Sequence, residues 1–435
     1  MVLNDSTGSE YRGKRVHVVG IKGTGVLGLA TVYHEMGAIV TGSDVADTFV
    51  TDVVLSELGI TPQSFSATNI TSDISLVVHS TAYNDTHIEI ARAHTLGIPV
   101  RTYTTALAEM VNAKKSIVVT GSHGKTTTSA MIATMLEHAG FDPTAVIGGM
   151  VSAWGRTARF GGSEWMVVEG DEYQEKILSY KAHIAVITNV DWDHPDYFKT
   201  QDAYEHLFRT FVESLSDAST LIISQSAAAV LKTSIAKTRA RVVQYEPVTF
   251  SLRVFGAHNA LNAGAALAVA HAVGMAGEVA TQSLSAFQGT KRRMEYYSDP
   301  EANQVLIDDF AHHPTEIRAT LAAVRSRYPK RHIIAVFQAH TYTRTQTFLE
   351  DFVASFSDAD EVLVLPIFAS AREQVSSLTA DDFASAIRVA HESVRACLSI
   401  EDAVALIRSS ATTAPSVVVA LGAGEQWRIV DALAH

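Results

Sequence analysis

The stretch 117–131, with the sequence IVVTGSHGKTTTSAM, constrains the fold of this chain more than any other. An apolar run ends in a glycine-containing turn, and Lys125, three threonines and a helical pattern follow it. This order predicts a strand, a phosphate-binding loop and a helix, because such a loop presents backbone N–H groups at the positive end of a helix. Lys125 would then reach the outer phosphates of a nucleotide, and the Thr126 hydroxyl would ligate Mg²⁺.

The match to a phosphate loop is imperfect, since the strict pattern has glycine where this chain has Val119. The alternative is an ordinary strand-to-helix turn with a solvated lysine. Three successive threonines disfavour that alternative, because β-branched residues are poor choices for starting a helix. The candidate nucleotide-binding residues of the loop are Gly121, Ser122, His123, Gly124, Lys125, Thr126 and Thr127.

The bulk properties of the chain exclude several classes of protein. A chain of 435 residues is too long to form a single hydrophobic core, and the usual domain size suggests about three domains. A net charge of −12 disfavours a general nucleic-acid binder. The single cysteine, Cys397, excludes an internal disulfide framework. Because the first residues lack an apolar signal core and no stretch approaches the ~20 apolar residues of a membrane span, we expect a cytoplasmic protein without membrane insertion.

The first third of the chain has a dinucleotide-like pattern. A buried-strand run, 15–20, leads into the glycine turn GIKGTGVLG, and Ser43 and Asp44 follow a second strand, 38–41. Such a turn can admit a pyrophosphate while an acidic residue meets a ribose. The alternative is a glycine turn that only permits close packing of helix on strand. The loop 79–82, after the strand 74–78, is predicted to line the same ligand crevice.

Two acidic motifs in the middle of the chain follow predicted strands. Glu169 comes after the strand 165–168, and His194 belongs to the segment 189–197 after the strand 182–188. Carboxylates at the ends of parallel strands can converge beside a phosphate loop and supply oxygen ligands for Mg²⁺. The alternative is a solvated acidic loop with a capping aspartate. Glu169 and His194 are the candidate metal ligands besides Thr126, although histidine is an unusual ligand for Mg²⁺.

The segment 253–270 begins with a glycine turn and continues as an alanine-rich helical pattern. His258, Asn259 and Asn262 cluster at its start, where asparagine amides suit the donor–acceptor edge of adenine. A plain helix cap is the competing interpretation. The cation run that includes Arg293 is usually a solvated surface, but at a domain joint it can neutralise phosphate.

The last third repeats strands that end in polar residues. Asp309 and His312 follow one such strand, Arg344 follows a second, and Arg372 follows a third. His312, Arg344 and Arg372 would form a carboxylate-binding pocket. The pair of histidines at 312–313 is more typical of a helix start than of zinc, because no further His/Cys spacing supports a zinc site.

Taken together, the motifs resemble one protein family. VVTGSHGKTTT, EGDEY, TNVDWDHPDYF, GAHNALNA, KRRMEY, DDFAHHPTEI and FQAHTYTRT occur in this order after GIKGTGVLGLA. Over nearly the whole chain they are similar to the Mur ligase family of peptidoglycan synthesis, and HPDYF, HTYTRTQ and SARE resemble the form typical of Gram-positive bacteria. Thr341 and Phe310 depart from the family pattern, where arginine and tyrosine are common.

The resemblance implies an α/β fold of three domains and assigns a role to each. Residues 1–112 would form a Rossmann-like domain that binds the UDP part of a substrate, 113–292 a central P-loop-type sheet that binds ATP and Mg²⁺, and 293–435 a Rossmann-like domain on the amino-acid side. The substrates would be UDP-N-acetylmuramate and L-alanine. The implied UDP-binding residues are Gly20, Gly23, Thr24, Gly25, Ser43, Asp44, Ser80, Thr81 and Ala82.

Lys125, His312, Asp309 and Arg344 are the implied catalytic residues, with His312 or Asp309 as the base. His258, Asn259, Asn262 and Arg293 join the phosphate loop in binding ATP. We expect a monomer or weak homodimer. The alternatives are a recycling ligase that attaches a murein tripeptide to UDP-N-acetylmuramate, a P-loop regulatory or transport ATPase, and a nicotinamide oxidoreductase built on the Gly20 turn.

Overall fold

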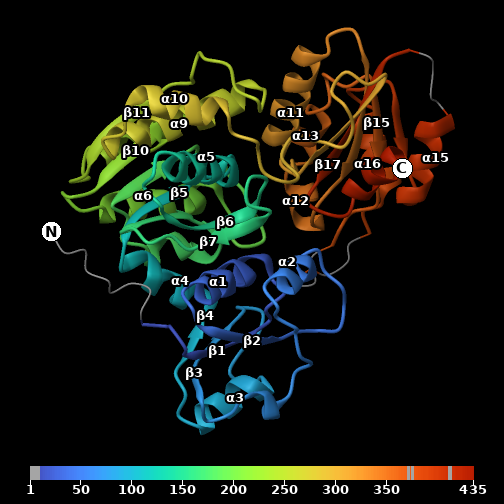
Figure 1. The fold of residues 1–435 in the computed structure, drawn as a ribbon. Helices are drawn as coiled ribbons and strands as arrows, with labels where there is room; N and C mark the ends of the chain where they lie inside the picture. Colours follow the sequence, from blue (N-terminus) through green and yellow to red (C-terminus); the bar gives the residue numbers. More distant parts are fainter. Residues whose placement is uncertain (1–9, 370–372, 374–376, 410–413) are drawn as a thin grey trace. The chain divides into compact units, whose positions relative to one another are not determined.

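The computed structural model describes residues 10–369, 373, 377–409 and 414–435 (Figure 1). The N-terminal residues 1–9 and the candidate Arg372 lie outside this set. The chain forms two compact units. The first contains Met1–Val190, Leu207–Glu246 and Ala263–Phe287, and the second contains Asp191–His206, Pro247–Asn262 and Gln288–His435. Among the residues that the structure describes, every helix is too short or too polar to span a bilayer.

The first unit begins with a four-stranded parallel sheet of order β2-β1-β3-β4. The inner strand β1 is buried after its first residue, as expected for a parallel strand covered on both faces. The strands are β1 Arg15–Val19, β2 Ile39–Ser43, β3 Ile74–His79 and β4 Val100–Thr102. The helices are α1 Thr24–Glu35, α2 Asp52–Glu57, α3 Ile88–Thr95 and α4 Tyr103–Asn112, with the 3₁₀ turn η1 Ala67–Asn69.

Helix α1 begins at Thr24 and therefore includes two glycines that the sequence placed in the preceding turn. A Cβ atom on Gly25 would lie 3.0 Å from the Tyr103 ring, and one on Gly28 would lie 3.2 Å from Thr157 Oγ1. These glycines let α1 approach its neighbours closely, which agrees with the packing interpretation of the turn.

The second sheet of the first unit has the order β11-β10-β9-β5-β8-β6-β7, and only the β6–β7 pair is antiparallel. Its strands are β5 Lys115–Thr120, β6 Thr144–Val151, β7 Arg156–Arg159, β8 Trp165–Glu169, β9 Ile184–Ile187, β10 Thr220–Ser224 and β11 Arg241–Tyr245. The associated helices are α5 Lys125–His138, η2 Tyr173–Ser179, α6 Gln201–Ser214, α7 Gln225–Val230, α8 Lys232–Ile235, α9 Ala257–Ala272 and α10 Gly277–Ser285. Because β5 lies between β8 and β9, the ends of these three strands meet at a topological switch point, where open α/β sheets bind ligands.

The second unit holds a six-stranded sheet of order β12-β13-β17-β14-β15-β16, antiparallel only at β12–β13. Its strands are β12 Glu295–Tyr296, β13 Gln304–Asp309, β14 His332–Gln338, β15 Glu361–Val364, β16 Val394–Ala396 and β17 Ser416–Gly422. Its helices are α11 Pro314–Arg327, α12 Tyr342–Thr347, α13 Leu349–Val353, α14 Ala380–Ile387, α15 Ile400–Ser409 and α16 Trp427–Ala434.

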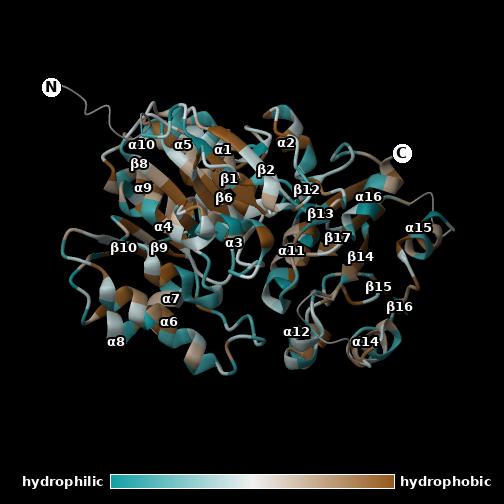
Figure 2. Cartoon of the chain, turned by 90° about the horizontal axis from the view of Figure 1, so that it is seen from below, coloured by the Kyte–Doolittle hydropathy of each residue, from teal (hydrophilic) through white to brown (hydrophobic). Residues whose placement is uncertain are grey.

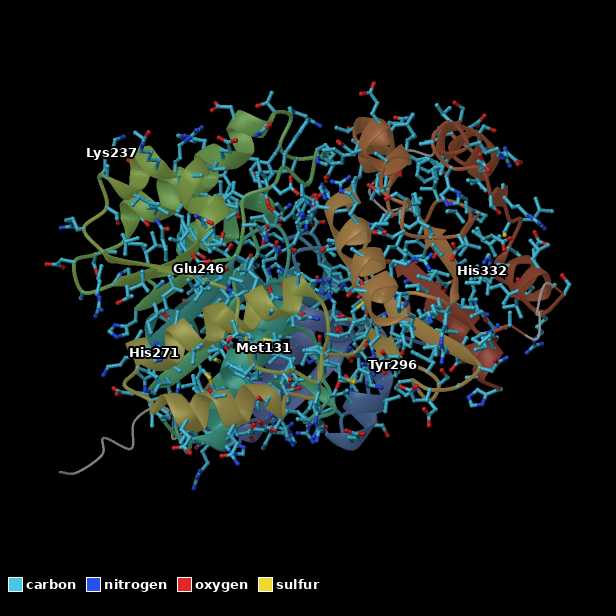
Figure 3. The ribbon with its side chains drawn as sticks, turned by 90° about the horizontal axis from the view of Figure 1, so that it is seen from above. Met131, Lys237, Glu246, His271, Tyr296 and His332 are labelled. Atoms are coloured by element: carbon cyan, nitrogen blue, oxygen red, sulfur yellow. The ribbon has the colours of Figure 1, made fainter. Side chains whose placement is uncertain are left out.

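Side chains of this sheet alternate between two hydrophobic clusters. Ile307 and Phe337 belong to the cluster formed with α11, α13 and α14, while Leu306 and Val336 belong to the cluster formed with α15 and α16. In the first unit, strands β1 and β6 carry hydrophobic colouring in Figure 2. Tyr296, labelled in Figure 3, fixes the edge strand β12 through a 3.0 Å hydrogen bond between its hydroxyl and that of Tyr328. The α/β class with three parallel-rich sheets is confirmed.

Candidate active site

The loop between β5 and α5 has the backbone that the sequence predicts for phosphate binding. Gly121 has φ +127°, and a Cβ atom there would lie only 2.2 Å from Thr188 Oγ1. Gly124 has φ +77° and is the N-cap of α5, so no side chain caps the helix. The N–H groups of the first helical turn lack intrahelical partners and lie at the positive end of the helix dipole. The loop thus presents donors to an anion, and glycine is required at both positions.

Residues after β9 hold this loop in place. Asn189 Oδ1 accepts a 2.9 Å hydrogen bond from the backbone N–H of His123, and Asn189 Nδ2 donates to the carbonyl of His123 at 3.0 Å. The Thr188 hydroxyl donates to the same carbonyl at 2.6 Å. Asn189 and Thr188 are therefore loop-positioning residues, and sequence reasoning missed them although it identified the segment that contains them.

Lys125 is held at the loop by three contacts. Its Nζ donates to the carbonyls of Gly121 at 2.6 Å and Ser122 at 2.9 Å, and it forms an ion pair with Glu172 Oε2 at 2.9 Å. Burial alone would lower the pKa of Lys125, but the carboxylates of Glu172 and Glu169 outweigh it and raise that pKa. The lysine is therefore charged, as phosphate binding requires.

Thr126 and Glu169 come together as candidate metal ligands. The Thr126 hydroxyl donates a 2.9 Å hydrogen bond to Glu169 Oε2, and the backbone N–H of Gly148 donates to the same oxygen at 2.8 Å. A hydroxyl and a carboxylate at the mouth of a phosphate loop are oxygen donors of the kind that Mg²⁺ takes. His194 belongs to the second unit, has φ +53° and lies beside Asp193, so its role as a metal ligand stays a prediction.

The ends of β1, β2 and β3 converge in the first unit. The N–H of Gly20 donates to the Ser43 carbonyl at 2.8 Å, and a Cβ atom on Gly20 would lie 2.9 Å from Ser80 Cβ. Gly23 and Thr24 begin α1 beside this point. The structure argues against one candidate contact, because the Ser43 side chain is fully buried and donates to Glu89.

The carboxylate of Asp44 accepts a hydrogen bond from the backbone of the glycine turn. Its Oδ2 accepts from the Lys22 N–H at 2.7 Å, and its Oδ1 accepts from the Val45 N–H at 2.8 Å. A cavity of about 390 Å³ opens beside it, with Lys22, Asp52 and Gln63 among its lining residues. The polar lining suits a hydrated ligand, while the contact of Asp44 with a ribose stays a prediction.

In the second unit, Asp309 joins two backbone segments. Its Oδ2 accepts from the Met294 N–H and its Oδ1 from the Ala311 N–H, both at 2.8 Å. Burial raises the pKa of Asp309 to about 6, and Arg293 opposes the rise. Asp309 thus positions two backbone segments beside Arg293, while each oxygen keeps a second lone pair, and its role as the base stays a prediction.

One ring nitrogen of His312 keeps a lone pair that can accept a proton. Its Nδ1 lies 3.0 Å from the carbonyl of Phe310, which can only accept, so Nδ1 carries the proton and Nε2 keeps its lone pair. Burial lowers the pKa of His312 to about 3, so the ring is neutral at pH 7. His313 is the N-cap of α11 in a capping box with Glu316, which agrees with the helix-start interpretation of the histidine pair.

Arg344 is engaged with partners that sequence reasoning did not identify. Its Nη2 lies 2.8 Å from Asp193 Oδ1, and its Nη1 lies 3.2 Å from His340 Nδ1. Both members of the ion pair are buried. This argues against Arg344 alone as the group that receives a substrate carboxylate, because much of its charge is already neutralised.

The adenine-side candidates cluster at the start of α9. Asn259 Nδ2 donates to the Phe255 carbonyl at 2.9 Å, and Asn262 Nδ2 lies 3.3 Å from Asn259 Oδ1. Burial lowers the pKa of His258 to about 4. The two asparagines thus make helix-start contacts, and their binding of adenine stays a prediction.

Comparison with known proteins places this chain. Three family descriptions match: "Mur ligase family, catalytic domain" over residues 15–115, "Mur ligase middle domain" over 119–247 and "Mur ligase, glutamate ligase domain" over 292–424. A UDP-N-acetylmuramate–L-alanine ligase of Desulfitobacterium hafniense is 39% identical, over 96% of this chain and 99% of that protein. The chain belongs to the Mur ligase family.

Other proteins support this Mur ligase assignment. A UDP-N-acetylmuramate–L-alanine ligase of a Methylobacterium species is 35% identical, over 95% of each chain. The crystal structure of the UDP-N-acetylmuramate–alanine ligase of Thermotoga maritima has a TM-score of 0.78 at 25% identity, covering 96% of this chain and 99% of its own. A murein peptide ligase of Psychrobacter arcticus shares the fold, with a TM-score of 0.69 at 23% identity over 97% and 99% of the two chains.

Proposed function

We propose that this protein is a cytoplasmic, ATP-dependent ligase that joins L-alanine to the lactyl carboxylate of UDP-N-acetylmuramate in the synthesis of peptidoglycan precursors. The observation that carries the proposal is the near full-length identity of 39% with a ligase of that name. The phosphate loop supports it chemically, because a charged lysine and a helix N-terminus suit the phosphates of a nucleotide triphosphate, and Thr126 with Glu169 suits its Mg²⁺.

A carboxylate and an amine do not condense in water unless the carboxylate is activated. In the proposed reaction, the lactyl carboxylate attacks the γ-phosphate of ATP in line and forms an acyl phosphate, and ADP leaves. Lys125 and Arg293 would offset the charge on the transferring phosphoryl group. Thr126 and Glu169 would hold Mg²⁺, which when bound neutralises phosphate charge.

The amine of L-alanine then attacks the acyl carbon and expels phosphate. Only the unprotonated amine is a nucleophile, so its ammonium form must lose a proton first. His312 and Asp309 are both candidate acceptors, because His312 keeps a lone pair on Nε2 and each oxygen of Asp309 accepts one hydrogen bond and keeps a second lone pair. The predicted oligomeric state is a monomer or weak homodimer.

The deciding experiment measures ADP release with UDP-N-acetylmuramate and a panel of amine substrates. L-alanine should give the highest kcat/KM, and Lys125→Ala should abolish ADP formation. A clear preference for a murein tripeptide would identify the recycling ligase instead. ADP release that does not need the nucleotide sugar would indicate a regulatory or transport ATPase.

A further inference from the structure

The buried carboxylate of Glu172 faces the ammonium of Lys125. Its oxygens lie 3.0 and 2.9 Å from Lys125 Nζ, and its side chain is only 1% exposed. None of the roles in the proposed reaction uses this residue. A buried carboxylate next to the one lysine of the phosphate loop therefore needs a separate account.

The backbone around Glu172 holds the carboxylate in position. A Cβ atom on Gly170 would lie 2.9 Å from Val118 Cγ1, so glycine lets the segment pass close to β5. Gln174 and Glu175 have φ of 56° and 59°, in the left-handed region that side chains rarely adopt, and the Glu175 N–H donates to the Glu172 carbonyl at 2.9 Å. Such a backbone persists only where its surroundings fix it.

The donors of Lys125 are fully used. An ammonium has three N–H donors. In this structure they serve the carbonyls of Gly121 and Ser122 and the carboxylate of Glu172. A phosphate oxygen can bind the ammonium only by taking the place of one of these acceptors. Glu172 is the anionic acceptor, and it also repels a phosphate that approaches.

We propose that Glu172 is a positioning residue that holds the charged Lys125 in the phosphate loop and competes with a nucleotide phosphate for its ammonium. The inference rests on the proposed function, because the competing phosphate is that of ATP. It implies that the protein binds the nucleotide less tightly than it would without Glu172. In return, Lys125 is charged and in position before the nucleotide binds.

The test is a calorimetric titration of the full chain with the non-hydrolysable analogue AMPPNP and Mg²⁺, without the other substrates. Glu172→Gln should bind AMPPNP about tenfold more tightly than the unmodified protein. Glu172→Asp, which withdraws the carboxylate by one methylene, should give a gain of about threefold and decides the question if Glu172→Gln does not fold. Glu164→Gln, at a glutamate that is 60% exposed, is the matched control and should leave the Kd unchanged.

A second comparison tests whether the tighter binding of AMPPNP by Glu172→Gln depends on Lys125. In a Lys125→Ala background, Glu172→Gln should give no tightening, because the ammonium for which Glu172 competes has been removed. An equal or weaker Kd in folded Glu172→Gln, or a gain that persists without Lys125, would overturn the inference. Failure of the proposed function is distinguishable, since it would appear as nucleotide binding by the unmodified protein without ligation of L-alanine.

Discussion

The guanidinium of Arg344 and the carboxylate of Asp193 form a buried ion pair in the second unit. Arg344 donates to Asp193 Oδ1 from Nε at 2.9 Å and from Nη2 at 2.8 Å. The two side chains are 4% and 5% exposed. Although burial alone would raise the pKa of Asp193, the positive charge of Arg344 holds it well below its usual range. The pair fixes the segment after β9 to the start of α12.

Asp193→Asn should destabilise the second unit by about 3–5 kcal/mol, because it leaves a buried guanidinium without its counter-charge. Chemical denaturation followed by a probe in that unit measures the loss, and Asp351→Asn, which changes an exposed carboxylate of the same unit, is the control. The lowered pKa of Asp193 determines how this contribution to stability changes with pH. The contribution is complete above about pH 4, the value in the unfolded chain, and is lost as the pH falls through the lower folded pKa. Equal stability of the two variants would contradict the prediction.

His312 should make the stability of the second unit fall in acid. An unfolded histidine takes up a proton near pH 6.5, whereas His312, with a pKa of about 3, stays neutral in the folded chain. Between these values the unfolded state binds more protons, so stability decreases as the pH falls. His312→Gln should therefore reduce the loss of stability between about pH 7 and pH 5 by about 2 kcal/mol. Denaturant titrations at the two pH values test this, and an unchanged difference would refute it.

The apolar strands were predictable from the sequence because parallel strands are buried on both faces and read as continuous hydrophobic runs. The polar strand β7, RTAR, escaped prediction because it is a short edge strand. Helix α5 begins at Lys125 and includes all three threonines, although their helix propensity is modest, because the phosphate loop imposes helical geometry on them. Helix α4 was also not predicted, because it begins at Tyr103, directly after the short strand β4 ends at Thr102.

The candidate site was predictable only where a short sequence motif by itself indicates what its residues bind. Lys125 and Thr126 were identified because a lysine and a threonine that follow a strand and a glycine turn form a phosphate-binding pattern. The contact of Lys125 with Glu172 spans 47 residues, and that of Arg344 with Asp193 spans 151. Such pairs depend on which strands become neighbours, and a single sequence does not contain that information. The hydrogen bond of Asp309 to Met294 and the burial of Ser43 against Glu89 were not predictable for the same reason.

Glu169→Gln should raise the Mg²⁺ concentration needed for half-maximal ADP release by about tenfold or more. Glu169 Oε2 already gathers the Thr126 hydroxyl and the Gly148 N–H, so the neutral amide would remove the negative charge while keeping the size of the side chain. Loss of a group that only orients a metal ligand already weakens metal affinity by about 10–100-fold, so loss of a ligand itself should cost at least as much. Glu164→Gln, at an exposed carboxylate just before β8, is the control. An unchanged Mg²⁺ dependence in Glu169→Gln would exclude it as a metal ligand.

Phe310 should matter for ATP through the arginines that flank it. The guanidinium carbons of Arg292 and Arg293 lie 5.1 and 4.9 Å from the centre of its ring, within the range of cation–π attraction. Arg292 has φ +59° and Met294 has φ +52°, so the backbone that carries Arg293 is itself strained and depends on such contacts. Phe310 therefore positions Arg293, the residue proposed to face phosphate.

Phe310→Leu keeps an apolar side chain but removes the aromatic face. It should raise the KM for ATP by about fivefold, which corresponds to roughly 1 kcal/mol of cation–π attraction, while the thermal midpoint changes little. Phe310→Tyr retains the ring and should behave like the unmodified protein. Steady-state ADP release over a range of ATP concentrations separates the effect on KM from that on kcat. If Phe310→Leu and Phe310→Tyr have the same KM for ATP, the ring does not position Arg293.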